Sequence, residues 1–133
     1  MGAWITLQFA ATYPERVDAV AVGGGGWNDW DKQLAQVAND IAVAFIHRGY
    51  RPAAFAACSA AFPELELTQA QVDALPLPLL GVVGSEDFAL PDLERLGAAV
   101  PEMELVIIEG TTHNSTLFAP EFQAALVEFF TAP

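Results

Sequence analysis

Two residues whose side chains could transfer protons stand at equivalent places in the sequence. Asp87 ends the segment GSED (residues 84–87), and His113 ends the segment GTTH (residues 110–113), and each segment directly follows a strongly apolar run. A histidine acts as a general base when an acid bonded to one of its ring nitrogens orients it. The pattern therefore predicts an acid–base pair in which Asp87 orients His113.

Each of these residues also has a simpler structural interpretation. Asp87 can cap a following helix or accept hydrogen bonds from turn amides. His113 can be a loop residue whose ring is bonded to the backbone. We favour the catalytic interpretation because both residues occupy the same place after consecutive strands.

The elements that position these residues are predicted to be strands of one parallel sheet. The continuous apolar runs 79–83 and 105–108 are typical of strands covered on both faces. The run 17–22, which is closed by four glycines, is predicted to be a further strand. Strands that alternate with helices indicate an α/β fold, and ligands bind at the edge formed by the strand carboxyl ends.

The helices are predicted from apolar residues at helical spacing. The first begins at residue 2 or 3, without a capping side chain, and ends at Pro14; its apolar face comprises Trp4, Leu7 and Ala11, widened by Ile5 and Phe9. The other predicted helices span residues 29–47, an alanine-rich stretch to about 62, 69–75 after a Thr68 cap, 90–100, and a segment from Pro120 with Phe122, Leu126, Phe129 and Phe130 on its apolar face.

The composition limits the class of protein. The chain has 133 residues, of which 53% are hydrophobic, so one packed domain is expected. Its 17 acidic and 5 basic residues give a formal net charge of −12, which argues against nucleic acid and anionic membranes as partners. No apolar run reaches membrane-spanning length. Cys58 is the only cysteine, and its lack of a disulfide partner fits a cytoplasmic location.

The remaining polar segments do not predict a metal or a phosphate ligand. The segment NDWD (residues 28–31) offers oxygen ligands, but it lacks the spacing of a calcium loop, so no metal site is expected. The glycines at 23–26 lack the spacing of a phosphate-binding loop.

The ordered motifs resemble the C-terminal half of the α/β-hydrolase fold. The resemblance is carried by the GxxD and GxxH loops after consecutive strands and by YPERV (residues 13–17), which looks like the family's link from helix to strand. It covers essentially the whole chain and implies a partial α/β-hydrolase fold, with parallel strands flanked by helices. The expected organisation is residues 1–23 (the helix after the nucleophile and strand six), 24–76 (a helical cap insertion) and 77–133 (the C-terminal core with the acid and histidine loops).

The resemblance implies cofactor-independent hydrolysis of an ester, amide or lactone by a nucleophile–His–Asp triad, in which Asp87 is the acid and His113 the base. The family nucleophile lies in a G-x-S-x-G elbow. Met1 and Gly2 match the last two positions of that elbow, so the serine is expected immediately before Met1. The backbone amide at the Met1 position would then bind an oxyanion. The chain is therefore expected to be a fragment of a serine hydrolase that is inactive alone.

The same resemblance suggests a pocket under the cap for a small, apolar to moderately polar substrate. Trp27, Trp30 and Phe45 are candidates for its lining, and packing of the cap on the core is the alternative for each. A different reading is a non-catalytic chain that pairs with itself or a partner through the exposed edge of strand 17–22. A flavodoxin-like binding domain is less favoured, because only three strands are clear and a phosphate loop is lacking.

Overall fold

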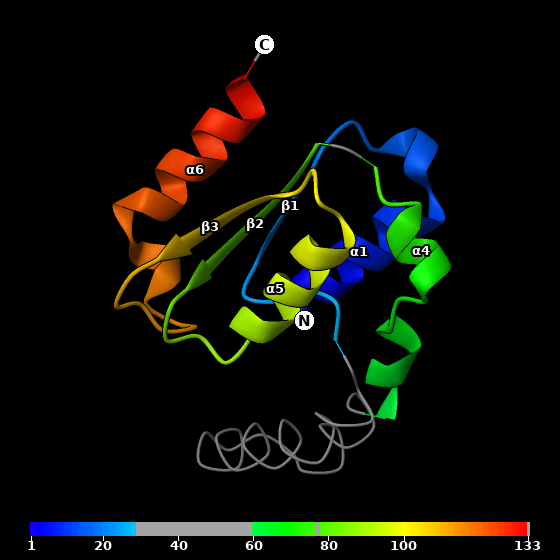
Figure 1. The fold of residues 1–133 in the computed structure, drawn as a ribbon, viewed down its shortest axis with the longest axis horizontal. Helices are drawn as coiled ribbons and strands as arrows, with labels where there is room; N and C mark the ends of the chain where they lie inside the picture. Colours follow the sequence, from blue (N-terminus) through cyan, green and yellow to red (C-terminus); the bar gives the residue numbers. More distant parts are fainter. Residues whose placement is uncertain (29–59, 77, 133) are drawn as a thin grey trace. The chain divides into compact units, whose positions relative to one another are not determined.

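A computed structural model of the protein describes residues 1–28, 60–76 and 78–132. Among these residues, three parallel strands form one sheet in the order β1 (Val20–Gly23), β2 (Leu79–Gly84) and β3 (Glu104–Ile108) (Figure 1). The central strand is β2, and its Gly81 pairs with Val22 on one side and with Leu105 on the other. The predicted α/β class with a parallel sheet is confirmed.

The chain divides into two compact units. One comprises Met1–Trp27 and Leu67–Pro133 and contains the sheet; the other is Asn28–Glu66. In the second unit, the described residues include the short helix η2 (Phe62–Leu65), whose Phe62 is buried. The helix predicted over 29–47 and the residues Trp30, Phe45 and Cys58 lie outside the described residues. The helical cap over 24–76 stays a prediction.

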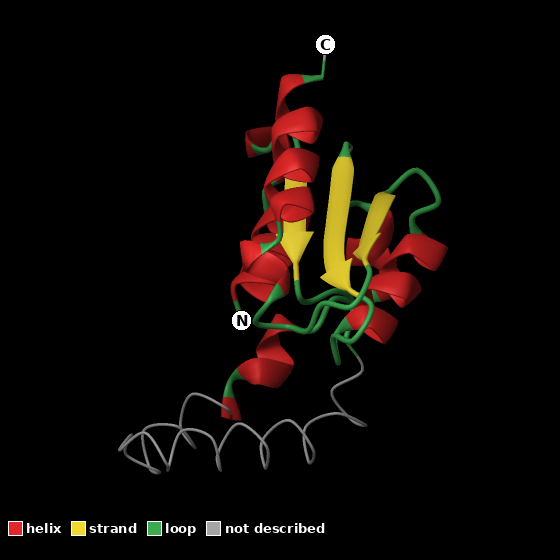
Figure 2. Ribbon diagram, turned by 90° about the vertical axis from the view of Figure 1, so that its left-hand side faces the viewer, coloured by secondary structure: helices red, strands yellow, loops and turns green. Residues whose placement is uncertain are grey.

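Helices cover both faces of the sheet (Figure 2). On one face lie α1 (Gly2–Thr12), α4 (Gln69–Asp73) and α5 (Leu90–Ala99), and on the other lies α6 (Pro120–Thr131). Because side chains alternate along a strand, β2 serves both faces: Leu79 and Val83 join the first core cluster, and Leu80 and Val82 join the second. All residues of β2 are buried, as expected for a central parallel strand.

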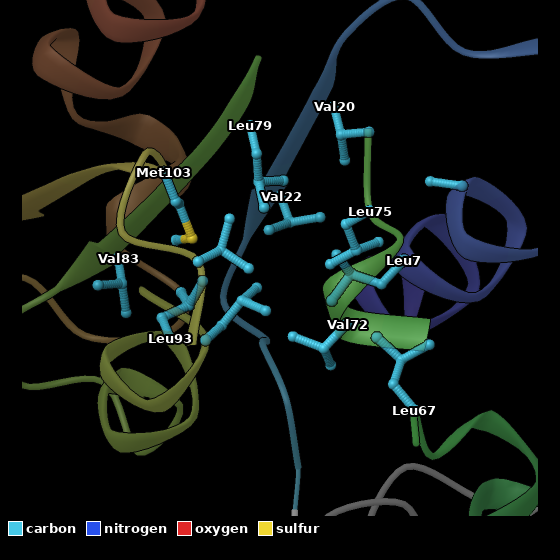
Figure 3. Close-up of a cluster of buried hydrophobic side chains, with 13 residues drawn as sticks. Leu7, Val20, Val22, Leu67, Val72, Leu75, Leu79, Val83, Leu93 and Met103 are labelled. Atoms are coloured by element: carbon cyan, nitrogen blue, oxygen red, sulfur yellow. The ribbon is translucent and has the colours of Figure 1, made fainter. Parts of the chain in front are cut away.

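The larger core cluster joins α1, α4 and α5 to the sheet. Leu7, Val72 and Leu93 project into the same cluster as Val22 of β1 (Figure 3). Burial of each such side chain contributes roughly 1.5–3 kcal/mol to folding. A Cβ at Gly81 would lie 2.3 Å from Cε of Met103, so any larger residue here would have to displace the end of the Met103 side chain.

Two strands differ from the prediction. Strand β1 begins at Val20 rather than at residue 17, because its pairing with β2 begins where Val20 meets Leu79, the first residue of β2; before it, the chain makes a turn of 3-10 helix (Pro14–Arg16). Strand β3 was expected to be covered on both faces, yet Ile107 is 41% exposed. It pairs only with β2 among the described residues and so lies at an edge of the sheet, where coverage is incomplete.

The predicted ends of the helices agree with the structure more closely than the predicted sets of buried residues on their apolar faces. Helix α4 begins after Thr68, which forms a capping box with Gln71, and α5 begins at Leu90 as expected. In α1, however, Ala10 rather than Ala11 is buried with Trp4 and Leu7. The residues expected to widen its apolar face, Ile5 and Phe9, are exposed, as is Phe130 of α6. No helix in the described ranges is long and apolar enough to cross a membrane.

Candidate active site

The loops that follow β2 and β3 are bonded to each other at the carboxyl edge of the sheet. The backbone N–H of Glu86 donates to the carbonyl of Thr111 over 3.0 Å, and the N–H of Gly110 donates to Oγ of Ser85 over 2.9 Å. At Gly84, a Cβ would lie only 2.0 Å from the Thr111 carbonyl oxygen. Glycine is therefore needed at the end of β2 for the two loops to meet.

This contact brings together the two residues predicted to form the acid–base pair. Nδ1 of His113 lies 3.0 Å from Oδ1 and 3.1 Å from Oδ2 of Asp87. The Asp87 side chain is 1% exposed, whereas that of His113 is 40% exposed. An ionised carboxylate only accepts hydrogen bonds, so Nδ1 carries the proton in this contact. Among the described residues, Nε2 of His113 has no hydrogen-bond partner and is left to exchange a proton with another group.

Asp87 also fulfils the structural role that was its alternative interpretation. Its Oδ1 accepts the backbone N–H of Ala89 over 2.9 Å, in the turn before α5. One buried carboxylate therefore fixes both the turn that precedes α5 and the histidine ring. The two interpretations of Asp87 describe different bonds of the same group.

The loop after β1 completes this edge of the sheet. Gly24 has a φ of +63°, and a Cβ at this position would lie 2.8 Å from Cε1 and 3.0 Å from Nδ1 of His113. The N–H of Gly24 donates to the carbonyl of Val82 over 3.3 Å. The loops after all three strands thus meet, as the strand order predicts, and the imidazole rests against the backbone of Gly24.

Hydroxyl groups within the histidine loop hold its shape. Thr116 is buried, and its Oγ1 lies 2.7 Å from the carbonyl oxygen of Thr112 and 2.9 Å from Oγ1 of Thr111. The N–H of Thr112 donates to Oγ of Ser115 over 2.8 Å. Sequence reasoning missed Thr116, although the dense run of hydroxyls around His113 was a visible signal of such a turn.

Sequence reasoning also missed an aromatic neighbour of the histidine. The ring of Phe88 stacks on the imidazole of His113, with centroids 4.5 Å apart and planes inclined by 30°. No periodic pattern points to Phe88, because it lies in the turn between β2 and α5 and is exposed.

The start of α1 lies near the same edge. A Cβ at Gly25 would lie 3.0 Å from Cβ of Ala3 and 3.2 Å from Nε1 of Trp4, so this end of the helix contacts the residue that follows Gly24. No side-chain hydrogen bond caps the helix. Burial lowers the pKa of the Met1 α-amino group, because loss of water disfavours the ammonium form. The oxyanion role of the Met1 position stays a prediction.

Trp27 is held by bonds within the sheet-containing unit. Its Nε1 donates to the carbonyl of Leu67 over 2.8 Å, and Cζ of Arg95 lies 3.9 Å from its ring centroid. Its backbone N–H donates to the carbonyl of Asp92. These contacts give Trp27 a structural role where the chain leaves and re-enters this unit. Its role in substrate binding stays a prediction, as do those of Trp30 and Phe45.

The described residues offer no metal centre. Within the three described ranges, no group of three or more His, Cys, Asp or Glu side chains is arranged to hold a metal ion.

Comparisons with known proteins connect this arrangement to one fold. No protein-family model matches the sequence, and no curated protein matches it. Solved structures do match. E-2-(acetamidomethylene)succinate hydrolase matches with a TM-score of 0.74 at 17% identity over 98% of this chain and 64% of its own. A structure from a study of carboxylesterases of the thaumarchaeon Nitrososphaera gargenis matches with a TM-score of 0.67 at 18% identity, covering 98% and 61% of the two chains.

A third match leads to the same assignment of the fold. The 2-hydroxy-6-oxo-6-phenylhexa-2,4-dienoate hydrolase from Rhodococcus sp. strain RHA1 has a TM-score of 0.68 at 20% identity, covering 99% of this chain and 62% of its own. At such identities the likeness concerns the fold alone. The chain has part of the α/β-hydrolase fold, and it spans about three fifths of the length of the structures that it matches.

Proposed function

We propose that this chain carries the acid and the base of a hydrolase active site, with His113 as the general base and Asp87 as the acid that orients it. The observation that carries the proposal is the bond from Nδ1 of His113 to the buried Asp87 carboxylate at 3.0 Å, with Nε2 left without a partner among the described residues. In this account, a nucleophile encoded upstream of Met1 completes the triad.

The pair would act in two proton transfers during hydrolysis of an ester, amide or lactone. Nε2 of His113 takes the proton of the nucleophile hydroxyl as its oxygen attacks the carbonyl carbon, and then gives that proton to the leaving group. A water molecule attacks the acyl intermediate by the same route and releases the free nucleophile. Asp87 stabilises the imidazolium formed in each step and keeps Nε2 directed toward the reacting oxygen.

Two features support this role over that of a simple capping turn. The loops of both residues are fixed to each other by backbone bonds, so the pair is set before any substrate binds. Such preorganisation is what acid–base catalysis requires. The uncapped start of α1 near Gly25 is also suited to bind the negative charge that develops on a carbonyl oxygen.

The proposal is tested first on the coding sequence upstream of the Met1 codon, in frame. We expect it to encode a G-x-S elbow at the end of a strand. The extended polypeptide should then hydrolyse p-nitrophenyl acetate, and the variants Asp87→Asn and His113→Gln should lose roughly 10⁴-fold in kcat. A stop codon directly upstream, without an elbow, would overturn the catalytic proposal for this chain. Full activity of the His113→Gln variant would do the same.

A second candidate function is self-association through β1. Two observations favour it. Among the described residues, β1 pairs only with β2, and the neighbouring α1 exposes Ile5 and Phe9. An apolar strand edge of this kind recruits a further strand, and a second copy of this chain offers the same edge. Sedimentation of the chain should then show dimers or larger species, and a stable monomer at all concentrations would contradict this function.

A further inference from the structure

The exposed ring of Phe88 occupies a position that calls for an explanation. It is 61% exposed, and it stacks on His113 at a centroid distance of 4.5 Å. A single exposed phenylalanine is ordinary on a protein surface. Phe118, for example, is 84% exposed, and it has no ring contact within the described part of the chain. Phe88 differs because one face of its ring lies on the imidazole.

Phe88 is fixed by the same carboxylate that binds the histidine. It stands between Asp87 and Ala89, and Oδ1 of Asp87 accepts the N–H of Ala89 over 2.9 Å while it also contacts Nδ1 of His113. The turn closed by this bond sets the direction in which the Phe88 side chain leaves the backbone. One buried oxygen therefore positions both rings of the stack.

The other contacts of His113 do not restrain its tilt by themselves. The hydrogen bond to Asp87 holds Nδ1, and the backbone of Gly24 lies against the Cε1–Nδ1 edge. Both contacts act on one edge of the ring, and the side chain is 40% exposed. The ring can still rotate about its Cβ–Cγ bond within the play of these contacts, whereas a flat neighbour against its face resists that rotation. Offset-stacked aromatic pairs favour this kind of geometry.

We infer that Phe88 is a positioning residue, whose stacked ring holds the His113 imidazole in the orientation that keeps Nδ1 on Asp87 and Nε2 open to solvent. The inference rests on the proposed function of His113 as a base. The negative face of the phenyl ring also lies against the imidazole, so it would attract the imidazolium that forms in the proposed reaction.

The test uses NMR signals of the His113 ring in the 133-residue chain, and it needs no catalytic activity. His47 is the only other histidine, so a His47→Gln variant assigns the signals. In Phe88→Leu, the ring-current shift of the Cε1 proton should be lost, and the Nδ1 proton should exchange with water roughly two- to tenfold faster. Phe88→Tyr keeps a ring and should retain both properties. Phe118→Leu is the matched control and should change neither.

Each outcome decides the inference. Unchanged exchange in Phe88→Leu, or a Phe88→Tyr variant that behaves like Phe88→Leu, overturns it. Circular dichroism verifies that the variants fold, and Phe88→Met, which keeps volume without a ring, replaces Phe88→Leu if that variant does not fold. The proposed function fails independently, through a missing upstream elbow or an active His113→Gln variant, and neither result alters these NMR signals.

Discussion

Two regions of the molecule differ in how much of their bonding and packing comes from their own residues. The acid–histidine loops, residues 84–89 and 110–116, are bonded to each other through backbone and hydroxyl groups. The α1–β1 edge, which comprises helix α1 and strand β1, leaves apolar side chains exposed. Ile5 is 51% exposed, and the rings of Phe9 and Tyr13, tilted by 48° with their centroids 5.2 Å apart, lie under the Arg16 guanidinium.

The geometry of the loops follows from their own hydrogen bonds, whereas the properties of the α1–β1 edge also depend on its surroundings. The loops hold Asp87 against His113, and the backbone of Gly24 lies against the same edge of the imidazole. The α1–β1 edge presents apolar surface and a strand that pairs with β2 alone in the described part of the chain, so its stability and association depend on what covers it. Changes in the loops should therefore act on the geometry of His113, and changes at the edge should act on association.

The largest effect is expected where the two loops cross. In Gly84→Ala, the new Cβ would lie 2.0 Å from the carbonyl oxygen of Thr111, and two backbones cannot separate without breaking the loop contacts. We expect a loss of about 3 kcal/mol in the free energy of unfolding, measured by urea denaturation. The control is Gly97→Ala in α5, where nothing lies within 4 Å, and where alanine should stabilise the helix by about 0.5–1 kcal/mol. Equal free energies of unfolding for the two variants would contradict the close contact between Gly84 and the Thr111 carbonyl.

The contact between the histidine and the loop after β1 can be isolated by a matched pair of glycines. Gly24 and Gly110 both have positive φ, +63° and +69°, but only a Cβ at Gly24 would meet His113. Gly110→Ala should lose about 1 kcal/mol from backbone strain alone. Gly24→Ala should lose about 2 kcal/mol and also shift the NMR signals of the imidazole. Identical His113 spectra in the two variants would contradict the contact.

Removing one hydroxyl of the network in the same loops should lower the free energy of unfolding by a smaller amount. Thr116→Val keeps the volume of this buried side chain, but it removes the bonds to the Thr112 carbonyl and the Thr111 hydroxyl. A loss of about 1 kcal/mol is expected, because both hydrogen bonds of the buried hydroxyl are lost, while the Thr112 carbonyl still accepts the backbone N–H of Thr116. Thr131→Val removes a comparable bond on the exposed surface of α6 and should change stability by less than about 0.5 kcal/mol. Thermal or urea denaturation compares the two.

The smallest effect on folding, and the sharpest test of the edge, comes from α1. Ile5→Glu places a charge on its exposed outer side and should change the free energy of unfolding by less than about 0.5 kcal/mol. If the α1–β1 edge mediates self-association, this variant should shift the sedimentation profile toward monomer. Phe130→Glu changes an exposed side chain of α6 and should leave the profile unchanged. A profile that responds only to Phe130→Glu would place association elsewhere.

The elements and the acid–base pair were open to sequence reasoning because they follow from periodicity and topology. Continuous apolar runs identified β2 and β3, and parallel strands must bring the loops with Asp87 and His113 to one edge. The start of β1 was wrong by three residues, since the apolar run does not reveal that pairing with β2 begins only at Val20 and Leu79. The exposure of Ile107 depends on which strand lies at the edge, a property of the assembled sheet.

The finer geometry of the site could not be predicted for a related reason. The stacking of Phe88 and the clearance at Gly84 arise between segments that are distant in sequence, and neither residue type signals its neighbour. Thr116 is different, because the hydroxyl-rich run after His113 was visible and only its bonding partners were unknown. The contacts between loops could therefore be found only in the structure, whereas the sheet edge at which they occur could be predicted from the sequence.

The central claim is that Asp87 fixes the histidine so that its Nε2 can accept a proton, and the tautomer of His113 tests it most directly. A long-range ¹H–¹⁵N spectrum of the chain, recorded where the ring is neutral and assigned with His47→Gln, identifies the nitrogen that carries the proton. The account predicts a proton on Nδ1 and none on Nε2, and loss of this preference in Asp87→Asn. A neutral ring with its proton on Nε2 in the unaltered chain would contradict the account.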